Sequence, residues 1–505
     1  MAVDANGTNG AQAETYHQEA LAALKDQSLF IKDAFLDGKF VSKDKEFDVY
    51  EPSTGTVLGK VANCTLDDFK AAIKSAETAQ QEFWATTTAA QRGGMLRKWF
   101  NLIIENQEDI GVILSLENGK TRSEAVGEVL YAASFISWFA EEATRSYGDT
   151  IPSSSPDTTV LTFKEPVGVC GIITPWNFPA AMITRKIAPA FAAGCSVVIK
   201  PPSETPYTCL ALTKLAVDAG IPPKIIQVCP TKDRAAATEL ATNPIVKKIS
   251  FTGSTGVGKM LAKLAADTLK KCSLELGGNA PFIVFEDADI DLAVEGAMFC
   301  KFRCTGQTCV CANRLIVQKS VLPQFTEKLV AKVAALKMGP GLDPSTTQGP
   351  LVNRGGVTKT AEHIADAVSK GATIAFGGKA PEVPGFFHEP TILSGVTPDM
   401  LVANDETFGP LAPIFSFDTE DDAVKLSNDT EFGLAGYFFS KDVARVMRVA
   451  RKLECGMVGV NTGKISAAEA PFGGVKESGY GREGSMYGIN EYQNIKSVTI
   501  GNNDK

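Results

Sequence analysis

Three cysteines lie close together in one short segment of the chain, and each offers a thiol to chemistry. They are Cys304, Cys309 and Cys311, and the segment passes through Gly306 into an apolar run at 315–317. A cysteine attacks as its thiolate, which needs a base, a cation or a helix N-terminus nearby. The chain has only 3 histidines, none in a motif-like setting, which disfavours a Cys–His hydrolase. The segment offers either a nucleophile that is activated in another way or buried structural cysteines.

A carboxylate in apolar surroundings could be the base that the histidines do not supply. Glu275 stands between two leucines in the segment 274–279, which continues with two glycines and an asparagine. Burial raises the pKa of a carboxyl group, so that it can take and give protons near neutrality. A lone glutamate is more often a solvated surface residue, and this segment alone leaves both interpretations open.

The composition excludes several classes of partner. With 44% hydrophobic and 21% charged residues, the chain has the balance of an ordinary soluble globular protein, and its 505 residues predict two or more domains. The net charge of −8 argues against nucleic acid or an anionic membrane as the main partner, but local arginines could still hold an anionic substrate. No apolar run approaches the ~20 residues that span a bilayer.

Cysteine usage and the first residues indicate the compartment. The 11 cysteines are scattered without metal-ligand spacing, so we predict no metal site and a reducing environment. Residues 1–14 are small and polar, and they lack the arginines of a transit peptide and the apolar core of a secretory signal. We therefore predict a disordered tail at 1–14 and a cytoplasmic protein.

Strands and helices must alternate in the middle of the chain. Two or three amphipathic helices are expected between 66 and 145. From about residue 167 the pattern predicts strands and helices in turn: strands at 169–173, 196–200, 225–229, 245–251 and 272–276, and helices at 183–193, 205–219, 234–242 and 256–269. This repetition predicts a parallel, doubly wound α/β sheet, which binds ligands at the carboxyl ends of its strands. Residues 174–177, 200–203 and 253–254 all follow strands, as that rule requires.

A glycine-rich turn at 253–258 opens one of these helices. Its spacing is G-x-x-G-x-G and not the G-x-G-x-x-G of the dinucleotide fingerprint. The N–H groups of a helix N-terminus favour a phosphate, but a purely structural turn explains the spacing equally well.

Three segments together resemble the aldehyde dehydrogenase superfamily: 274–279, the nucleophile segment 301–314, and Thr-Pro-Trp-Asn-Phe-Pro at 174–179. The resemblance runs from about residue 30 onward, and within the superfamily it is strongest to the succinate-semialdehyde dehydrogenases. It implies two Rossmann-like doubly wound domains and a small β oligomerisation arm. The implied division is a cofactor-binding domain at 15–149 and 167–279, a catalytic domain at 280–480, and the arm at 150–166 and 481–505. A homo-oligomer, either dimer or tetramer, follows from the arm.

The same resemblance implies the catalytic roles. Cys309 would add to the aldehyde, Asn177 and the backbone N–H of Cys309 would hold the oxyanion, and Glu275 would activate the water that hydrolyses the thioester. Two other readings remain: a relative that passes the acyl group to coenzyme A, and a non-catalytic structural protein on the same fold. The intact Glu275 favours hydrolysis over the first, and the presence of all three residues argues against the second.

The resemblance also implies a nicotinamide cofactor, and its expected contacts are Thr174, Pro175, Trp176, Lys200, Ser203, Gly253, Ser254, Leu276, Glu406 and Phe408. In many NAD-preferring relatives a glutamate stands three positions after the lysine, where this chain has Ser203. A carboxylate there would repel a 2′-phosphate, whereas a hydroxyl can donate to it. We therefore expect NADP or NAD as cofactor, with NADP accepted and favoured by this position.

Two arginines point to a small aldehyde that carries a carboxylate. Arg185, Arg303 and Ser466 match positions that bind the substrate carboxylate in succinate-semialdehyde dehydrogenases, although each arginine alone is as easily a surface or structural residue. The expected reaction is oxidation of succinate semialdehyde to succinate, as in 4-aminobutyrate degradation, with a glutarate-semialdehyde or broader enzyme as the alternative. Cys311 is a candidate redox partner of Cys309, or else a packed structural cysteine.

Overall fold

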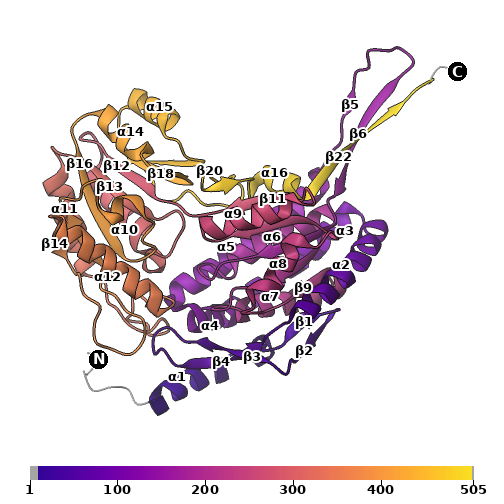
Figure 1. Cartoon of the computed structure of the whole chain (residues 1–505), viewed down its shortest axis with the longest axis horizontal. Coiled ribbons are helices and arrows are strands. Elements are labelled where there is room, and N and C mark those ends of the chain that lie inside the picture. The colour runs from indigo at the N-terminus through magenta and orange to yellow at the C-terminus, as the bar shows by residue number, and fades with distance from the viewer. Residues whose placement is uncertain (1–9, 503–505) are drawn as a thin grey trace.

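The computed structural model describes residues 10–502 (Figure 1). Helix α1 spans Gly10–Ala22, so the expected disordered tail is wrong for residues 10–14, where alanine and glutamate are good helix formers. The remainder of that predicted tail, residues 1–9, lies outside the described residues, as do the last three residues of the expected arm.

The first of two large sheets carries the alternating pattern. Its strand order is β2-β1-β9-β8-β7-β10-β11-β21, and the five central strands β9, β8, β7, β10 and β11 are parallel to one another. The strand bounds are β1 Ala34–Leu36, β2 Lys39–Val41, β7 Val169–Ile173, β8 Ser196–Lys200, β9 Ile226–Val228, β10 Val246–Thr252, β11 Lys271–Glu275 and β21 Gly479–Tyr480. The predicted strands are confirmed to within two residues. A separate hairpin of β3 Glu46–Tyr50 and β4 Val57–Ala62 precedes the helices.

Helices cover both faces of this sheet. Their bounds are α2 Leu66–Thr86, α3 Ala89–Glu105, α4 Gln107–Asn118, α5 Arg122–Glu142, α6 Ala181–Ala193, α7 Tyr207–Asp218, α8 Arg234–Thr242 and α9 Thr255–Ala266. One apolar core holds α3 to α7 against one face, and another holds α2, α8 and α9 against the other. Such two-sided burial is what a parallel sheet requires.

The segment between 66 and 145 contains four α-helices, where two or three were expected. Three of them begin with a capping box, at Thr65, Thr88 and Thr121. In each box the threonine side chain and the residue three positions later satisfy each other's backbone N–H groups, which sets a helix start. The extra boundary falls at Asn106, between α3 and α4, where no side-chain cap marks it.

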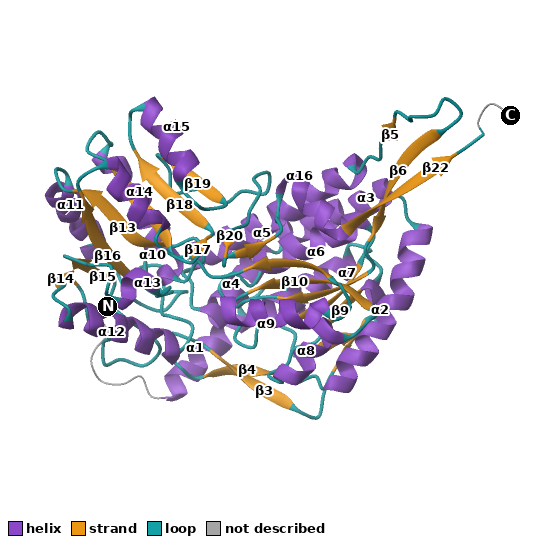
Figure 2. Cartoon of the chain, turned by 45° about the horizontal axis from the view of Figure 1, so that its top comes forward, coloured by secondary structure: helices purple, strands orange, loops and turns teal. Residues whose placement is uncertain are grey.

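The second sheet is formed by strands between residues 280 and 460 and is ordered β14-β15-β16-β13-β12-β18-β19. Its strands are β12 Ala280–Val284, β13 Ala312–Gln318, β14 Thr373–Phe376, β15 Thr391–Ser394, β16 Leu411–Phe417, β18 Ala435–Phe439 and β19 Met457–Val460. The helices around it are α10 Ile290–Phe302, α11 Leu322–Ala334, α12 Arg354–Ser369, α13 Leu401–Asn404, α14 Glu420–Asn428 and α15 Val443–Lys452. Figure 2 shows the strands of both sheets lying among helices.

A narrow three-stranded sheet projects from the body at the upper right of Figure 1. It has the order β22-β6-β5, with β5 at Thr150–Ile151, β6 at Thr159–Pro166 and β22 at Gln493–Ile500. Phe163 and Ile495 on it are 49% and 71% exposed. A small sheet with exposed apolar side chains gains stability from packing against another surface, which agrees with the expected arm.

A short connection between the two sheets positions the site. The chain crosses from the carboxyl end of β11 at Glu275 to the amino end of β12 at Ala280. Loops after the first sheet's strands therefore face loops before the second sheet's strands. The side chain of Asn177, just after β7, donates to the carbonyl of Gln307, just before β13, over 3.0 Å.

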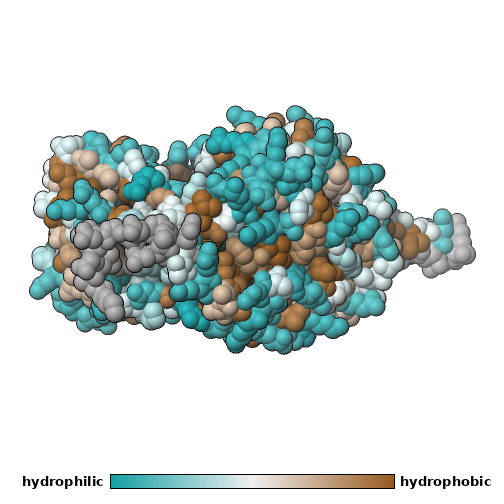
Figure 3. Space-filling view, turned by 90° about the horizontal axis from the view of Figure 1, so that it is seen from below, coloured by the Kyte–Doolittle hydropathy of each residue, from teal (hydrophilic) through white to brown (hydrophobic). Residues whose placement is uncertain are grey.

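The surface is mixed in character. Figure 3 shows polar side chains interspersed with apolar ones on the face seen from below. Within residues 10–502, no helix combines the length and the apolar character needed to cross a membrane.

Candidate active site

A strained turn presents Cys309. Helix α10 ends at Phe302, and a short 3-10 turn follows in which Cys304 and Thr305 have φ values of 51° and 57°. Gly306 has φ 73°, and a Cβ there would come within 2.1 Å of the carbonyl of Gly409. Only glycine tolerates such an approach, so the turn presses the nucleophile segment against the loop that precedes β16.

Cys309 opens into a cavity of about 160 Å³. The cavity is lined by Tyr131, Phe178, Met182, Arg185, Arg303, Thr308, Cys309, Val310, Ser466 and Phe472. All three residues expected to bind a carboxylate, Arg185, Arg303 and Ser466, thus share one cavity with the expected nucleophile. They come from α6, from the turn after α10 and from the loop after β19. An apolar cavity with a few convergent polar groups is the usual form of a small-molecule site.

The thiol of Cys309 is protonated in the resting structure. Burial raises its pKa to about 12, although the nearby Arg185 guanidinium opposes the shift; the carboxyl groups of Glu406 and Glu275 add to it. A thiol with so high a pKa needs a base to become a nucleophile. None of the 3 histidines lines this cavity: His17 contacts Glu51, His363 is bonded to Thr407 and His388 to the carbonyl of Glu389.

Asn177 follows β7 and bonds to the segment that carries Cys309. It is buried, and one of its two amide hydrogens is committed to Gln307. Its backbone carbonyl accepts from Lys120 over 2.5 Å, and Lys120 also pairs with the buried Glu128. Glu128 in turn accepts from the N–H of Ala180, so the loop is held rigidly. The second amide hydrogen of Asn177 can serve an oxyanion.

Glu275 is buried at the end of β11, and neither of its carboxyl oxygens has a hydrogen-bond partner among the described residues. Burial raises its pKa well above the usual value and Glu483 adds to the shift, whereas Arg185, Lys186 and Arg482 oppose it. The carboxyl group is therefore held near the protonated form, ready to exchange protons. The expected apolar setting was incomplete, because charged residues from α6 and the segment after β21 surround Glu275.

Glu483 is a site residue that the sequence did not indicate. Both oxygens of its buried carboxylate accept charged hydrogen bonds, one from Arg185 and one from Lys186. These two cations hold the pKa of Glu483 below its usual value, although burial opposes the shift. Glu483 is far from α6 in the chain, so only the fold brings them together. A glutamate among glycines in the segment 481–484 was the one available signal.

The guanidinium of Arg185 is bonded to a buried carboxylate, and the side chain also lines the cavity. Its Nε donates to Glu483, and its plane lies 4.0 Å from the ring centroid of Phe472. Its Nη2 is buried and has no partner among the described residues. The side chain is only 1% exposed, so an anion in the cavity would meet this N–H group away from water.

Arg303 faces the same cavity from the opposite wall. Its guanidinium lies 5.4 Å from the ring of Phe178 and 4.6 Å from that of Phe299, and its Nε is buried without a partner among the described residues. Tyr131 also lines the cavity, and no sequence motif marks it. Burial raises the pKa of the Tyr131 hydroxyl, and hydrogen bonds with Arg185 and Ser466 oppose this shift.

Most of the expected cofactor residues lie at the carboxyl ends of strands in the first sheet. In register, Ile173 pairs with Lys200 and Thr252 pairs with Glu275, so the loops that follow these strands are neighbours. These loops hold Thr174, Pro175, Trp176, Lys200, Ser203, Gly253, Ser254 and Leu276. Ser254 is the N-cap of α9 and makes no side-chain cap hydrogen bond, which leaves the helix N-terminus able to receive a phosphate.

The second sheet contributes the other two cofactor residues. Phe408, at φ 56°, meets Trp176 edge to face with ring centroids 5.4 Å apart. Glu406 accepts one bond from the N–H of Gly278 over 3.2 Å, and burial raises the pKa of its carboxyl group to about 7. The buried hydroxyl of Thr174 has no partner among the described residues. Unpaired polar groups beside an aromatic pair fit a ribose and a pyridine ring.

A carboxylate that the sequence reading overlooked lies beside Ser203. The hydroxyl of Ser203 donates to Glu204 over 3.0 Å. Burial lowers the pKa of the neighbouring Lys200, and Glu204 opposes that shift. Ser203, Glu204 and Lys232 line a cavity of about 330 Å³. The hydroxyl expected to meet a 2′-phosphate thus already has an acidic partner.

Cys311 and Cys304 lie on either side of the nucleophile. Cys311 is buried with its sulfur 3.4 Å from the ammonium of Lys301, and all 11 cysteines, which fall within the described residues, are free thiols. Burial raises the pKa of Cys304 to about 12. The disulfide between Cys309 and Cys311 stays a prediction.

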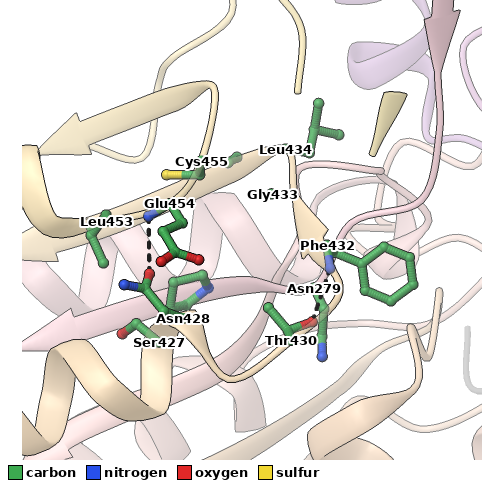
Figure 4. Close-up of a pocket in the computed structure, with 12 residues that line it drawn as sticks. Asn279, Ser427, Asn428, Thr430, Phe432, Gly433, Leu434, Leu453, Glu454 and Cys455 are labelled. Atoms are coloured by element: carbon green, nitrogen blue, oxygen red, sulfur yellow. Dashed lines mark hydrogen bonds between the residues drawn. The ribbon is translucent and has the colours of Figure 1, made fainter. Parts of the chain in front are cut away.

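A small pocket elsewhere in the described chain leaves no room for a substrate. Figure 4 shows a pocket lined by Asn279, Asn428, Thr430 and Glu454, with a volume of about 10 Å³, which suits a single water molecule. No group of three or more histidine, cysteine or acidic side chains with metal-binding geometry occurs within residues 10–502.

Comparisons with known proteins agree with the geometry. The model of the aldehyde dehydrogenase family matches residues 40–498. The chain is 53% identical over 480 residues to a glutarate-semialdehyde dehydrogenase of Pseudomonas aeruginosa, covering 95% of this chain and 99% of that protein. It is 52% identical to a succinate-semialdehyde dehydrogenase [NADP(+)] of Escherichia coli, with the same coverage. The crystal structure of an NADP-dependent enzyme of E. coli superimposes with a TM-score of 0.94 at 52% identity, covering 95% of this chain and 100% of that chain. The protein therefore belongs to the aldehyde dehydrogenase family.

Proposed function

We propose that the protein oxidises succinate semialdehyde to succinate with NADP+ or NAD+. The observation that carries the proposal is the shared cavity, in which Cys309 lies with Arg185, Arg303 and Ser466. Binding an uncharged aldehyde would need neither of the two arginines. A carboxylate in such a cavity needs charge-assisted donors, and Nη2 of Arg185 and Nε of Arg303 are both unpaired among the described residues.

In the proposed mechanism, the thiol of Cys309 first gives its proton to solvent, and the thiolate then adds to the aldehyde carbon. The oxyanion that forms accepts hydrogen bonds from Asn177 and from the backbone N–H of Cys309. The bound cofactor supplies an acceptor for the hydride that leaves this carbon. Glu275 then takes a proton from the water that attacks the thioester, and release of the acid restores the thiol.

Two residues position this chemistry without touching the reacting atoms. Glu483 holds Arg185 and Lys186 in place, and Lys120 fixes the backbone carbonyl of Asn177. A carboxylate anchored by the arginines would place the aldehyde at Cys309 for one chain length only. Glutarate semialdehyde, one methylene longer, is the second candidate, because a relative named for that substrate shares 53% of its residues with this chain.

We infer that both cofactors are accepted. No carboxylate occupies position 203, which supports NADP+, while Glu204 one residue later supports NAD+. The free state of all 11 cysteines supports a reducing compartment such as the cytoplasm, and the projecting sheet supports a homo-oligomer.

The proposal is tested by initial rates of cofactor reduction at 340 nm without coenzyme A. Succinate semialdehyde, glutarate semialdehyde and butanal are compared, each with NADP+ and NAD+. We expect the highest kcat/KM for succinate semialdehyde. A higher value for glutarate semialdehyde would select the second candidate, and equal values for butanal would overturn both.

A further inference from the structure

A second cavity adjoins the Cys309 cavity and has its own cation. It measures about 110 Å³ and shares four lining residues with the first: Arg303, Thr308, Val310 and Ser466. Its remaining lining residues are Phe299, Cys300, Tyr437, Gly463, Lys464 and Ile465. Cys309 lines the first cavity and not the second. A group bound in the second cavity would therefore be separated from the Cys309 thiol by Arg303, which lines both cavities.

Two cations share one aromatic ring at this place. The guanidinium of Arg303 lies 4.6 Å from the ring centroid of Phe299, and the ammonium of Lys464 lies 5.5 Å from the same centroid. Neither cation forms an ion pair with a carboxylate among the described residues, and the Nε of Arg303 is buried and unpaired there. Like charges that converge on one cavity repel each other unless an anion comes between them.

Two polar groups of this cavity are already satisfied. The hydroxyl of Tyr437 donates to the carbonyl of Val310 over 2.8 Å, and the thiol of Cys300 donates to the carbonyl of Gly463 over 3.4 Å. A Cβ at Gly463 would come within 2.7 Å of the Cys300 sulfur, so the wall is closely packed there. Among the described residues that line this cavity, Arg303 has a buried unpaired Nε, Lys464 is an exposed cation, and the rest of the lining is largely apolar, which suits an anion at the end of a methylene chain.

We propose that this second cavity is an anion subsite in which Lys464 and Arg303 hold the carboxylate of unbranched ω-carboxyaldehydes longer than four carbons. The proposal rests on the proposed function, because it extends the same carboxylate-binding wall. Arg303 lines both cavities, so it would bind the carboxylate of short substrates in the first and that of longer substrates in the second. Lys464 lines the second cavity and not the first, so it would bind the longer substrates alone and would set the chain length that the enzyme accepts.

The test compares Lys464→Met, which keeps the length of the side chain and removes its charge, with Lys464→Arg. Lys70→Met, at an exposed lysine on α2, is the matched control. For each protein kcat/KM is measured with the four-, five- and six-carbon ω-carboxyaldehydes and with butanal and hexanal. Thermal unfolding of each variant verifies that it folds.

We expect Lys464→Met to lower kcat/KM about threefold to fivefold for the five- and six-carbon acids, a size set by the exposure of this lysine. The four-carbon acid and both uncharged aldehydes should keep their values, and Lys464→Arg and Lys70→Met should behave as the parent. An equal fall for all three acids, or no change for any, would overturn the subsite. Failure of the proposed function has a different signature, namely a parent enzyme that oxidises butanal as efficiently as the four-carbon acid.

Discussion

Arg185, which lines the Cys309 cavity, forms a buried ion pair with Glu483. The carboxylate accepts from Nε of the arginine, and the arginine's Nη2 remains unpaired among the described residues. One guanidinium therefore serves both the fold and the site. This double role decides which substitutions can test the substrate assignment.

Arg185→Ala should damage the fold as well as catalysis. It leaves Glu483 with Lys186 as its only ion-pair partner, and breaking a buried pair costs about 3 kcal/mol or more. We expect a lower denaturant midpoint and a loss of activity on charged and uncharged aldehydes alike. Equilibrium unfolding and kinetics with succinate semialdehyde and butanal measure both effects. A variant with parental stability would show that the ion pair contributes little.

Glu275→Gln should separate the two halves of the reaction. Acylation of Cys309 precedes the step that needs an activated water, so rapid mixing should still show a burst of reduced cofactor. Steady turnover should fall by about a hundredfold or more, the usual contribution of a general base. Cys309→Ala should abolish both phases. Full steady turnover in Glu275→Gln would remove this residue from the mechanism.

The burst should become faster as the pH rises. The pKa of the Cys309 thiol is raised to about 12, and this thiol must lose its proton before it can attack the aldehyde. Below such a pKa the deprotonated fraction grows tenfold per pH unit, so the burst rate constant should increase steadily between pH 6 and 9. Stopped-flow measurements at saturating cofactor give the profile. A flat profile across this range would mean that cofactor or substrate binding resets the thiol pKa.

Glu204 should control the cofactor ratio. Glu204→Gln removes the charge beside Ser203 and should raise kcat/KM for NADP+ relative to NAD+ by about fivefold or more, through loss of repulsion toward a 2′-phosphate. Ser203→Glu should shift the ratio in the opposite direction. Paired measurements with the two cofactors at fixed aldehyde give the ratio. If it stays constant in both variants, other residues set the preference.

Local patterns in the sequence were enough to predict the first sheet, because each of its strands and helices carries its own periodicity. The resemblance of distinctive segments to the aldehyde dehydrogenases drew attention to Cys309, Glu275 and Asn177, and their catalytic roles stay predictions. Glu483 and Tyr131 were missed, since their roles arise from contacts with α6 that span long stretches of chain. Glu204 was missed for another reason. The argument about the 2′-phosphate concerned position 203 alone, and only the structure shows that Glu204 accepts a hydrogen bond from Ser203.

Arg303→Ala offers the most direct test of the central claim, that the Cys309 cavity recognises a carboxylate. Arg303 is half-buried and has no ion pair among the described residues, so its loss should leave the fold intact. The measurement is kcat/KM for succinate semialdehyde divided by that for butanal, in the parent and in Arg303→Ala. The account predicts that this ratio falls at least about tenfold, equivalent to ~1.4 kcal/mol of carboxylate binding. An unchanged ratio would contradict it, because Arg303 would then be a structural residue and the cavity would not select its substrate by charge.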